Sequence, residues 1–322
     1  MSARSPHTTA LLMLLLANAF WGLSFPLIKA IITAHQQLVP ESGNWFITAM
    51  TIAPRFLLGG IVIGLLARSQ LADASRGEVR QGLLLGLSAS LGMLFQTDGL
   101  QFTHASTSAF LTQFYAIMIP VYVAVRSRRW PRPVVWLSGV LVLAGVGILS
   151  GLNLRELHLG RGELETLISS VFFMWQILVL EHKGYAGNRV LPVTAVMFAT
   201  QAIIFSVMAL LTAPTLSAVL EPWTSGPWLV FTVLLTGFCT IGSFTLMNRY
   251  QPAITATEAG LLYCTEPIFT SALALFLPGL LSLWAGLTYA NELLTWHLVV
   301  GGALITLANL VIQFRPARPA PA

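Results

Sequence analysis

Long apolar stretches, separated by short polar breaks, run along nearly the whole chain. A helix crosses the core of a bilayer in about 20 residues. Transmembrane β-strands alternate apolar and polar residues, and the continuous run from Leu11 to Leu16 does not. The chain is therefore expected to be an all-α polytopic membrane protein with ten transmembrane helices. The expected ranges are 10–32, 46–67, 81–101, 106–125, 134–151, 163–182, 192–213, 227–248, 255–277 and 295–314.

Composition supports this class. Of the 322 residues, 56% are hydrophobic and only 9% are charged, whereas about a quarter of the residues of a soluble domain are charged. The formal net charge of +5 comes from arginines clustered between apolar stretches, so membrane orientation explains it better than a nucleic-acid partner. Cys239 and Cys264 lie inside apolar stretches and the histidines are scattered, so we expect no disulfide, metal or cofactor.

The N-terminus resembles a cleavable signal peptide, with Arg4, the Leu11 to Leu16 run and the small triplet 17–19. Apolarity continues past that triplet to Ile31, which is long enough for a full span. We therefore expect this segment to be retained as the first helix. Cleavage would leave nine helices.

Lysine and arginine are distributed unevenly between the two expected sides. In the ten-helix arrangement 13 of the 17 fall on one side, and only Arg155 and Arg161 fall on the other. The positive-inside rule then places both termini in the cytoplasm. The short loops and the excess of arginine over lysine fit a bacterial inner (plasma) membrane.

The expected helices divide into two sets of five, which would enter the membrane in opposite orientations. The expected units are residues 1–151, a periplasmic linker at 152–162, and residues 163–322 with a cytoplasmic tail. Ser108-Ala109 precedes Pro120 as Thr255-Ala256 precedes Pro267, at a constant offset of 147 residues. Inverted repeats place a binding site near the bilayer midplane. Chance recurrence of proline and small residues is the alternative.

Several short motifs together resemble the EamA family of the drug/metabolite transporter superfamily. They are Trp21–Phe25 with Lys29, Arg55–Leu58, Gln96–Thr103 followed by Pro120, Glu266–Phe269, Glu292-Leu293 and Gly301–Ile305. The resemblance implies a secondary transporter that commonly exports amino acids, metabolites or drugs, although uptake and exchange also occur. The segment 278–291, with Pro278, Gly279 and Gly286, departs from the family pattern and is expected to be an interfacial helix or a re-entrant turn.

Acidic residues at membrane depth are costly and therefore suggest function. Glu258 is our candidate for proton coupling or for binding a substrate amine, with hydration near the cytoplasmic end as the alternative. Thr265 lies seven residues, about two turns, further on and would share a helix face with Glu258. Glu266 precedes Pro267, and a structural role there competes with a role in the site. Asp98 is expected at a solvated periplasmic rim, and Glu165 is a further acidic candidate.

Basic residues within the expected helices have different explanations. Lys29 lies near a helix end and can extend to the interface, so a structural role is expected. Arg55 is deeper. It is expected either to bind a substrate anion or carboxylate, or to form an ion pair that holds the fold.

Polar and aromatic residues complete the candidate site. Gln113 and Tyr115 belong to an unusually polar helix and are candidate substrate contacts, with helix packing as the alternative. Trp21 and Trp175 lie midway along the first helix of each half and could form aromatic walls or fill core space.

We expect a non-enzymatic exporter of amino acids or related metabolites and drugs. Its expected partners are the solute and membrane lipid, and protons are a candidate coupling ion. Uptake or exchange is one alternative, and a non-transporting membrane enzyme or structural protein is another. The sequence contains no Gly-x-x-x-x-Gly-Lys-Ser/Thr, His-Glu-x-x-His or Gly-x-Ser-x-Gly segment, so ATP hydrolysis and hydrolase chemistry have no supporting motif.

Overall fold

The computed structural model describes residues 6–126, 128, 130, 133–149, 160–254 and 256–313, and this part of the chain is helical without β-strands. The main helices are α1 (Pro6–Leu38), α2 (Asn44–Leu66), α4 (Arg76–Gly99), α5 (Ala105–Thr112), α6 (Tyr115–Arg126), α7 (Pro133–Leu149), α8 (Arg161–Glu181), α9 (Val190–Thr212), α11 (Gly226–Leu234), α12 (Ser243–Tyr250), α13 (Ala256–Tyr263), α14 (Glu266–Ala274), α15 (Leu277–Ala285) and α16 (Trp296–Gln313). The short elements are α3 (Arg68–Ala72), α10 (Leu216–Leu220), the 3₁₀ turns η1 (Lys183–Tyr185), η2 (Glu221–Thr224) and η4 (Gln251–Ala253), and the π-helix η3 (Leu235–Gly242).

The all-helical membrane class is confirmed. Among the described residues, 6 helical stretches are long and apolar enough to cross a membrane. They are His7–Leu38, Asn44–Leu66, Ala105–Arg126, Arg161–Glu181, Val190–Thr212 and Gly226–Ala253. The ten ranges expected from the sequence all overlap helices, but ten membrane crossings and an inverted repeat remain predictions.

Three of the expected helices are not regular. The range 106–125 is divided between α5 and α6 at Gln113 and Phe114, and the range 255–277 is divided between α13 and α14 at Cys264 and Thr265. Pro267 explains the second break, because its ring excludes the carbonyl of Tyr263 from a continuous helix. The range 227–248 contains η3, a local widening of the helix.

The segment after the ninth expected helix forms α15, which is bent by 50° from α14. A chain without regular structure then leads from Gly286 to α16. The hydroxyl of Ser282 pins this connection to α15, since it donates to the carbonyl of Tyr289 at 2.6 Å and accepts from its N–H at 3.1 Å.

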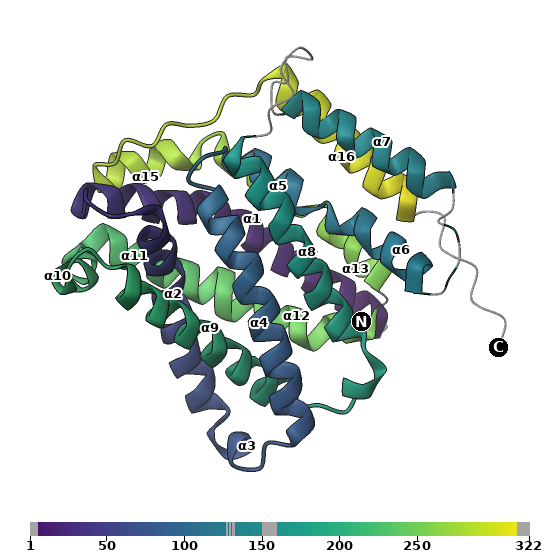
Figure 1. Ribbon diagram of the computed structural model, residues 1–322, viewed down its shortest axis with the longest axis horizontal. Helices are drawn as coiled ribbons and strands as arrows, with labels where there is room; N and C mark the ends of the chain where they lie inside the picture. The colour runs from purple at the N-terminus through teal and green to yellow at the C-terminus, as the bar shows by residue number, and fades with distance from the viewer. Residues whose placement is uncertain are drawn as a thin grey trace, which may run out of the picture.

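Helices from the two parts of the chain alternate in one row. In Figure 1, α2, α9, α4 and α8 lie side by side in that order, and the same pairs make extensive contacts. Gly99 at the end of α4 and Gly162 at the start of α8 allow the closest approach, because a Cβ on Gly99 would lie 2.8 Å from the Gly162 carbonyl oxygen. The row therefore has no boundary that separates the first half from the second.

The helix α1 crosses this row and packs against α12 and α14, while α7 and α16 pair with each other at one side of the molecule (Figure 1). Gly22 permits the α1–α14 contact, since a Cβ there would lie 2.5 Å from Cβ of Phe269. This contact brings the middle of α1 beside the beginning of α14.

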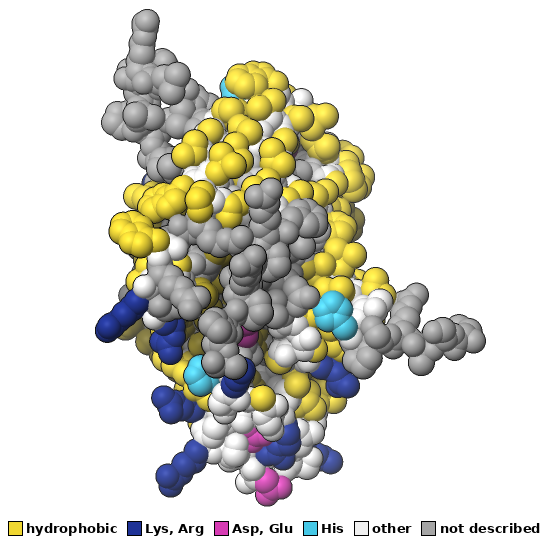
Figure 2. Space-filling model, turned by 90° about the vertical axis from the view of Figure 1, so that its right-hand side faces the viewer, with side chains coloured by type: hydrophobic (Ala, Val, Ile, Leu, Met, Phe, Trp, Pro, Cys, Tyr) yellow, Lys and Arg dark blue, Asp and Glu magenta, His cyan; other side chains and the backbone are white. Residues whose placement is uncertain are grey.

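Basic side chains gather at one end of the molecule. Figure 2 shows Lys and Arg in the lower part of the view, below a surface covered by hydrophobic side chains. Arg68, Arg76 and Arg80 are exposed there with Lys183 and Arg189, at the ends of helices that we expect to face the cytoplasm. At the same end Ser75 and Glu78 form a capping box that starts α4.

Candidate functional site

The two broken helices meet in the interior of the molecule. Gln113 ends α5 and Glu266 begins α14, and both side chains are buried. The Gln113 side-chain amide donates a hydrogen bond of 3.2 Å from Nε2 to Oε2 of Glu266. These two residues are 153 positions apart in the chain. The bond therefore joins the two halves of the chain at the places where their helices are interrupted.

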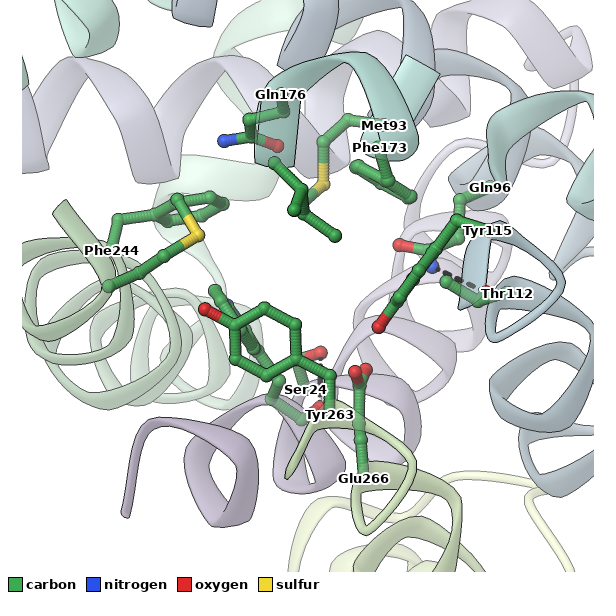
Figure 3. Close-up of a pocket in the computed structure, with 13 residues that line it drawn as sticks. Ser24, Met93, Gln96, Thr112, Tyr115, Phe173, Gln176, Phe244, Tyr263 and Glu266 are labelled. Carbon is green, nitrogen blue, oxygen red and sulfur yellow. Dashed lines mark hydrogen bonds between the residues drawn. The ribbon is translucent and has the colours of Figure 1, made fainter. Parts of the chain in front are cut away.

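A cavity lies beside this junction. In Figure 3, the carboxyl of Glu266 and the side chains of Tyr115 and Tyr263 point toward the open space. Gln96 and Thr112 line the same side and share a hydrogen bond of 2.9 Å. The remaining described lining residues are Trp21, Ser24, Met93, Phe173, Gln176, Ile177, Phe244 and Met247. Pockets for small organic ligands have this mixture of apolar walls and few polar groups.

Aromatic rings form one wall of the cavity. Trp21 makes edge-to-face contacts with Phe244 and with Tyr263, each with ring centroids 5.6 Å apart. The indole N–H of Trp21 is buried without a partner among the described residues, and so is the side-chain nitrogen of Gln176. The wall thus combines aromatic faces with polar atoms that remain unsatisfied.

The break in the ninth expected helix is held from α1. The side-chain nitrogen of Asn18 donates to the carbonyl of Leu262 at 2.7 Å and to the hydroxyl of Thr265 at 3.1 Å. The Thr265 hydroxyl in turn donates to the same carbonyl at 2.7 Å. Carbonyl groups released by the interruption therefore have partners, and Glu266 is fixed at the first position of α14.

On the expected periplasmic side of the cavity, the helices are joined by buried polar contacts. The hydroxyls of Ser108 on α5 and Thr166 on α8 lie 3.2 Å apart. Thr103 donates to the carboxylate of Glu163 at 2.6 Å. These contacts hold the two halves together between the cavity and the helix ends.

The carboxylate of Glu292 makes a further link on that side. It accepts hydrogen bonds from the N–H of Ala105 at 2.8 Å and from both the N–H and the hydroxyl of Ser106. These donors lie in the first turn of α5, where unpaired N–H groups favour a carboxylate. The connection between α15 and α16 is therefore attached to the first half of the chain.

Four predicted site residues are brought together. Gln113 and Glu266 are hydrogen bonded, and Tyr115, Trp21 and Glu266 line the cavity. Thr265 lies next to them but bonds to α1 and its own helix. The helix is interrupted at Cys264 and Thr265, and the face shared by Glu258 and Thr265 stays a prediction. The side chain of Glu258 lies outside the described part of the structure.

Trp175 does not belong to the cavity. Its side chain is 46% exposed and contacts Tyr122 edge-on at 6.3 Å. Its neighbours on α8, Phe173 and Gln176, face the cavity instead. Of the two roles considered for Trp175, an aromatic wall of this cavity is therefore excluded, because the side chain lies on the exposed side of α8.

Arg55 is fully buried but lies outside the cavity lining. Its Nε donates to the hydroxyl of Thr240 at 2.8 Å, and Nη2 donates to the carbonyl of Cys239 at 3.4 Å. Both partners belong to η3. None of the described acidic side chains forms an ion pair with Arg55, so the expected ion pair is replaced by neutral acceptors of the π-helix.

Asp98 is not at a solvated rim. It is fully buried, accepts a hydrogen bond from the hydroxyl of Thr48 at 3.0 Å, and pairs with Arg161. Arg161 also pairs with Glu165 at 2.8 Å. The burial arises because α8 begins directly against the end of α4, which brings Arg161 over the carboxylate. This cluster connects the two halves, as the Ser108–Thr166 contact does.

Lys29 extends toward a helix end, as expected, where its ammonium donates to the carbonyl of Thr103. A second cavity on this side is lined by Lys29, Glu163, Tyr289 and Glu292, among others. It lies at the expected periplasmic ends of the helices.

Sequence reasoning missed several cavity residues. Tyr263 and Phe244 are indistinguishable by sequence from other aromatic residues of apolar helices. Gln96 and Gln176 could have been predicted, because a glutamine within an apolar stretch needs a hydrogen-bond partner or a water-filled cavity.

The comparisons with known proteins agree with this architecture. Residues 8–151 match the EamA-like transporter family. Residues 8–151 are an EamA-like transporter domain. Over 309 residues the chain is 25% identical to an uncharacterized transporter from Archaeoglobus fulgidus. The matched region covers 94% of this chain and 85% of that protein. A solved crystal structure shares the fold with a TM-score of 0.59 and 18% identity, covering 95% of this chain and 96% of the other.

The EamA-like domain supplies α1, α4, α5 and α6 to the cavity, and residues beyond it supply α8, α12, α13 and α14. The family match and the name of the archaeal relative support a membrane transporter. The cavity therefore lies between the EamA-like domain and the second half of the chain.

Proposed function

We propose that this protein is a secondary transporter that moves a small organic solute across a cell membrane by alternating access. The observation that carries the proposal is the meeting of two interrupted helices at a cavity, with Gln113 bonded to Glu266. In secondary transporters, interrupted helices in corresponding positions of two halves form the solute site near the midplane.

The pairing of helices supports two inverted five-helix repeats. The helix α8 contacts α4 and α5, and α1 makes the equivalent contacts with α12 and α14. The helices α7 and α16, the last of each expected repeat, pack against each other. A duplicated unit would generate these reciprocal pairs. Alternating access would then come from movement of one half against the other around the cavity.

We propose that the protein exports its solute from a bacterial cytoplasm, and that the solute is an amino acid, a related metabolite or a drug. The family resemblance and the basic helix ends support it, because the positive-inside rule places those ends in the cytoplasm. In this orientation, polar contacts close the periplasmic half above the cavity, with Ser108 and Thr166 among them. Uptake or exchange on the same scaffold is the second candidate.

The experiment is a flux assay in proteoliposomes with a labelled panel of amino acids, amines and other metabolites, with and without an imposed pH gradient. Wild type is compared with Glu266→Gln, Glu258→Gln and the control Glu41→Gln, whose position is exposed and distant from the cavity lining. We expect flux of at least one solute, a loss of tenfold or more in Glu266→Gln, and wild-type flux in Glu41→Gln.

The pH gradient tests whether flux is coupled to protons. The variants Glu258→Gln and Glu266→Gln test which of the two carboxyl groups is responsible. Flux that follows the pH gradient in wild type but becomes independent of it in Glu258→Gln would place proton coupling at Glu258, whereas the same change in the residual flux of Glu266→Gln would place it at the cavity. Gradient-independent flux would indicate a facilitator or an exchanger. Absence of flux for the whole panel would contradict the proposal and favour a non-transporting membrane protein.

A further inference from the structure

The described lining of the cavity beside Glu266 has an acidic side chain and no basic one. Among its described lining residues Glu266 is the sole carboxyl, and none is lysine, arginine or histidine. The two deep basic side chains of the first half are engaged elsewhere, Arg55 with η3 and Lys29 with the carbonyl of Thr103. A solute in the cavity would therefore meet a carboxyl and no cationic side chain.

Backbone groups near the site do not supply a binding place for an anion. At the start of α14, Pro267 has no N–H, and the N–H groups of Ile268 and Phe269 donate to the Thr265 carbonyl at 3.1 and 3.3 Å. At the start of α6, the N–H of Ala116 donates to Gln113 at 3.0 Å. Both interrupted helices thus use these backbone donors internally. The described lining offers a substrate carboxylate the neutral N–H donors of Trp21 and Gln176 but no positively charged side chain.

The aromatic wall favours a cation. Trp21, Tyr263 and Phe244 are locked together by edge-to-face contacts, and the ring of Tyr115 stands beside the Glu266 carboxyl (Figure 3). Aromatic faces attract ammonium groups, and the attraction grows where water is excluded. A buried carboxylate is costly without a counter-charge, and a cationic solute would provide one.

We infer that the substrate is a small organic monocation, an amine with an apolar or aromatic body, held by the Glu266 carboxyl within this wall. The inference rests on the proposed transport function and narrows its substrate class. Within the proposed range of amino acids, metabolites and drugs, it selects amines without a carboxylate over zwitterionic amino acids. Gln113 orients the carboxyl through its 3.2 Å hydrogen bond.

The test uses three probes that share a phenyl group and an alkyl chain but differ in charge. They are phenethylamine, phenylalanine and phenylpropionate, which are a cation, a zwitterion and an anion at neutral pH. Binding to the purified full chain is measured by calorimetry, for wild type, Glu266→Gln, Glu266→Asp and Glu41→Gln. Wild type is expected to bind phenethylamine at least tenfold more tightly than either other probe.

In Glu266→Gln we expect phenethylamine binding to weaken tenfold or more, with partial recovery in Glu266→Asp and no change in Glu41→Gln. If Glu266→Gln does not fold, the order of the three probes on wild type and the effect of Glu266→Asp still test the inference. Phenylalanine or phenylpropionate binding as tightly as the amine would overturn it, and so would the absence of amine binding to wild type.

The same probes distinguish this inference from the proposed function. Flux of phenylalanine but not phenethylamine in proteoliposomes would overturn the substrate class and leave the transporter in place. Tight amine binding without flux of any solute would support the substrate class and contradict transport.

Discussion

At the cytoplasmic end of α4, one carboxylate joins two helices that come from different halves. Glu78 accepts hydrogen bonds from Nε of Arg189 at 2.7 Å and from the N–H of Ser75 at 2.8 Å. It lies outside the six candidate spans. The hydrogen bond from the Arg189 side chain is the main cause that lowers the pKa of Glu78 from 4.5 to about 2.

This pKa predicts a pH dependence of stability. The folded state favours the charged carboxylate, so its stabilisation is fully present above about pH 4.5 and is lost as the pH falls toward 2. Melting temperatures of wild type and Glu78→Gln in detergent, measured from pH 7 to pH 3, should differ most at pH 7 and converge on acidification. The exposed Glu41→Gln variant should follow wild type. A gap between wild type and Glu78→Gln that is unchanged by pH would contradict the assignment.

Single residues show where the sequence was informative and where it was not. Gln113, Tyr115, Trp21 and Glu266 stood out as polar or aromatic groups in apolar stretches, and they meet at the cavity. Trp175 stood out equally but faces outward. Helix faces that contact lipid and helix faces that contact the protein core have similar apolar residues. The sequence of a membrane helix therefore does not show which way an aromatic side chain points, because this depends on the neighbouring helices.

At the scale of elements, the interruptions are the feature that the sequence concealed. Pro267 marks the break between α13 and α14, but no proline lies at the break between α5 and α6, and Pro120 falls within α6. The positions of the helices were predictable from apolarity, because every range that we expected overlaps a helix. The turns that divide those ranges, and the π-helix η3, depend on tertiary partners such as Asn18 and Arg55.

The contact between α1 and α14 predicts the effect of a single methyl group. In Gly22→Ala the new Cβ would lie 2.5 Å from Cβ of Phe269 and 3.1 Å from the backbone nitrogen of Thr270. We expect a loss of about 1–3 kcal/mol in stability from overpacking, together with reduced flux, because α14 carries Glu266. Thermal unfolding in detergent and the flux assay check the two effects.

The matched control is Gly64→Ala on α2, where nothing lies within 4 Å of the new Cβ. It should unfold at or above the wild-type temperature, since alanine favours a helix over glycine. Equal melting temperatures for the two variants would show that α1 and α14 are not in close contact.

At the scale of the whole molecule, the proposed cycle requires the periplasmic half to open. The hydroxyls of Ser108 and Thr166, 3.2 Å apart on α5 and α8, should separate in that step. The double variant Ser108→Cys and Thr166→Cys, in a background with Cys239→Ala and Cys264→Ala, should therefore lose flux at least tenfold on oxidation. Reductant should restore it.

Each single cysteine variant serves as the control and should keep its flux in oxidant. Formation of the disulfide is verified by the loss of maleimide labelling of both introduced thiols under nonreducing conditions. Full flux through a chain with this bridge would show that α5 and α8 stay together throughout transport.

The alternating row of α2, α9, α4 and α8 has a consequence for biosynthesis. When the first half leaves the ribosome, α4 has neither of the neighbours that flank it in the finished protein, because α9 and α8 are made later. The helix α9 can take its place between α2 and α4 only after both have been made. The two halves are thus separate in the sequence but do not assemble separately. The helices of the first half complete their packing only after those of the second half have been made.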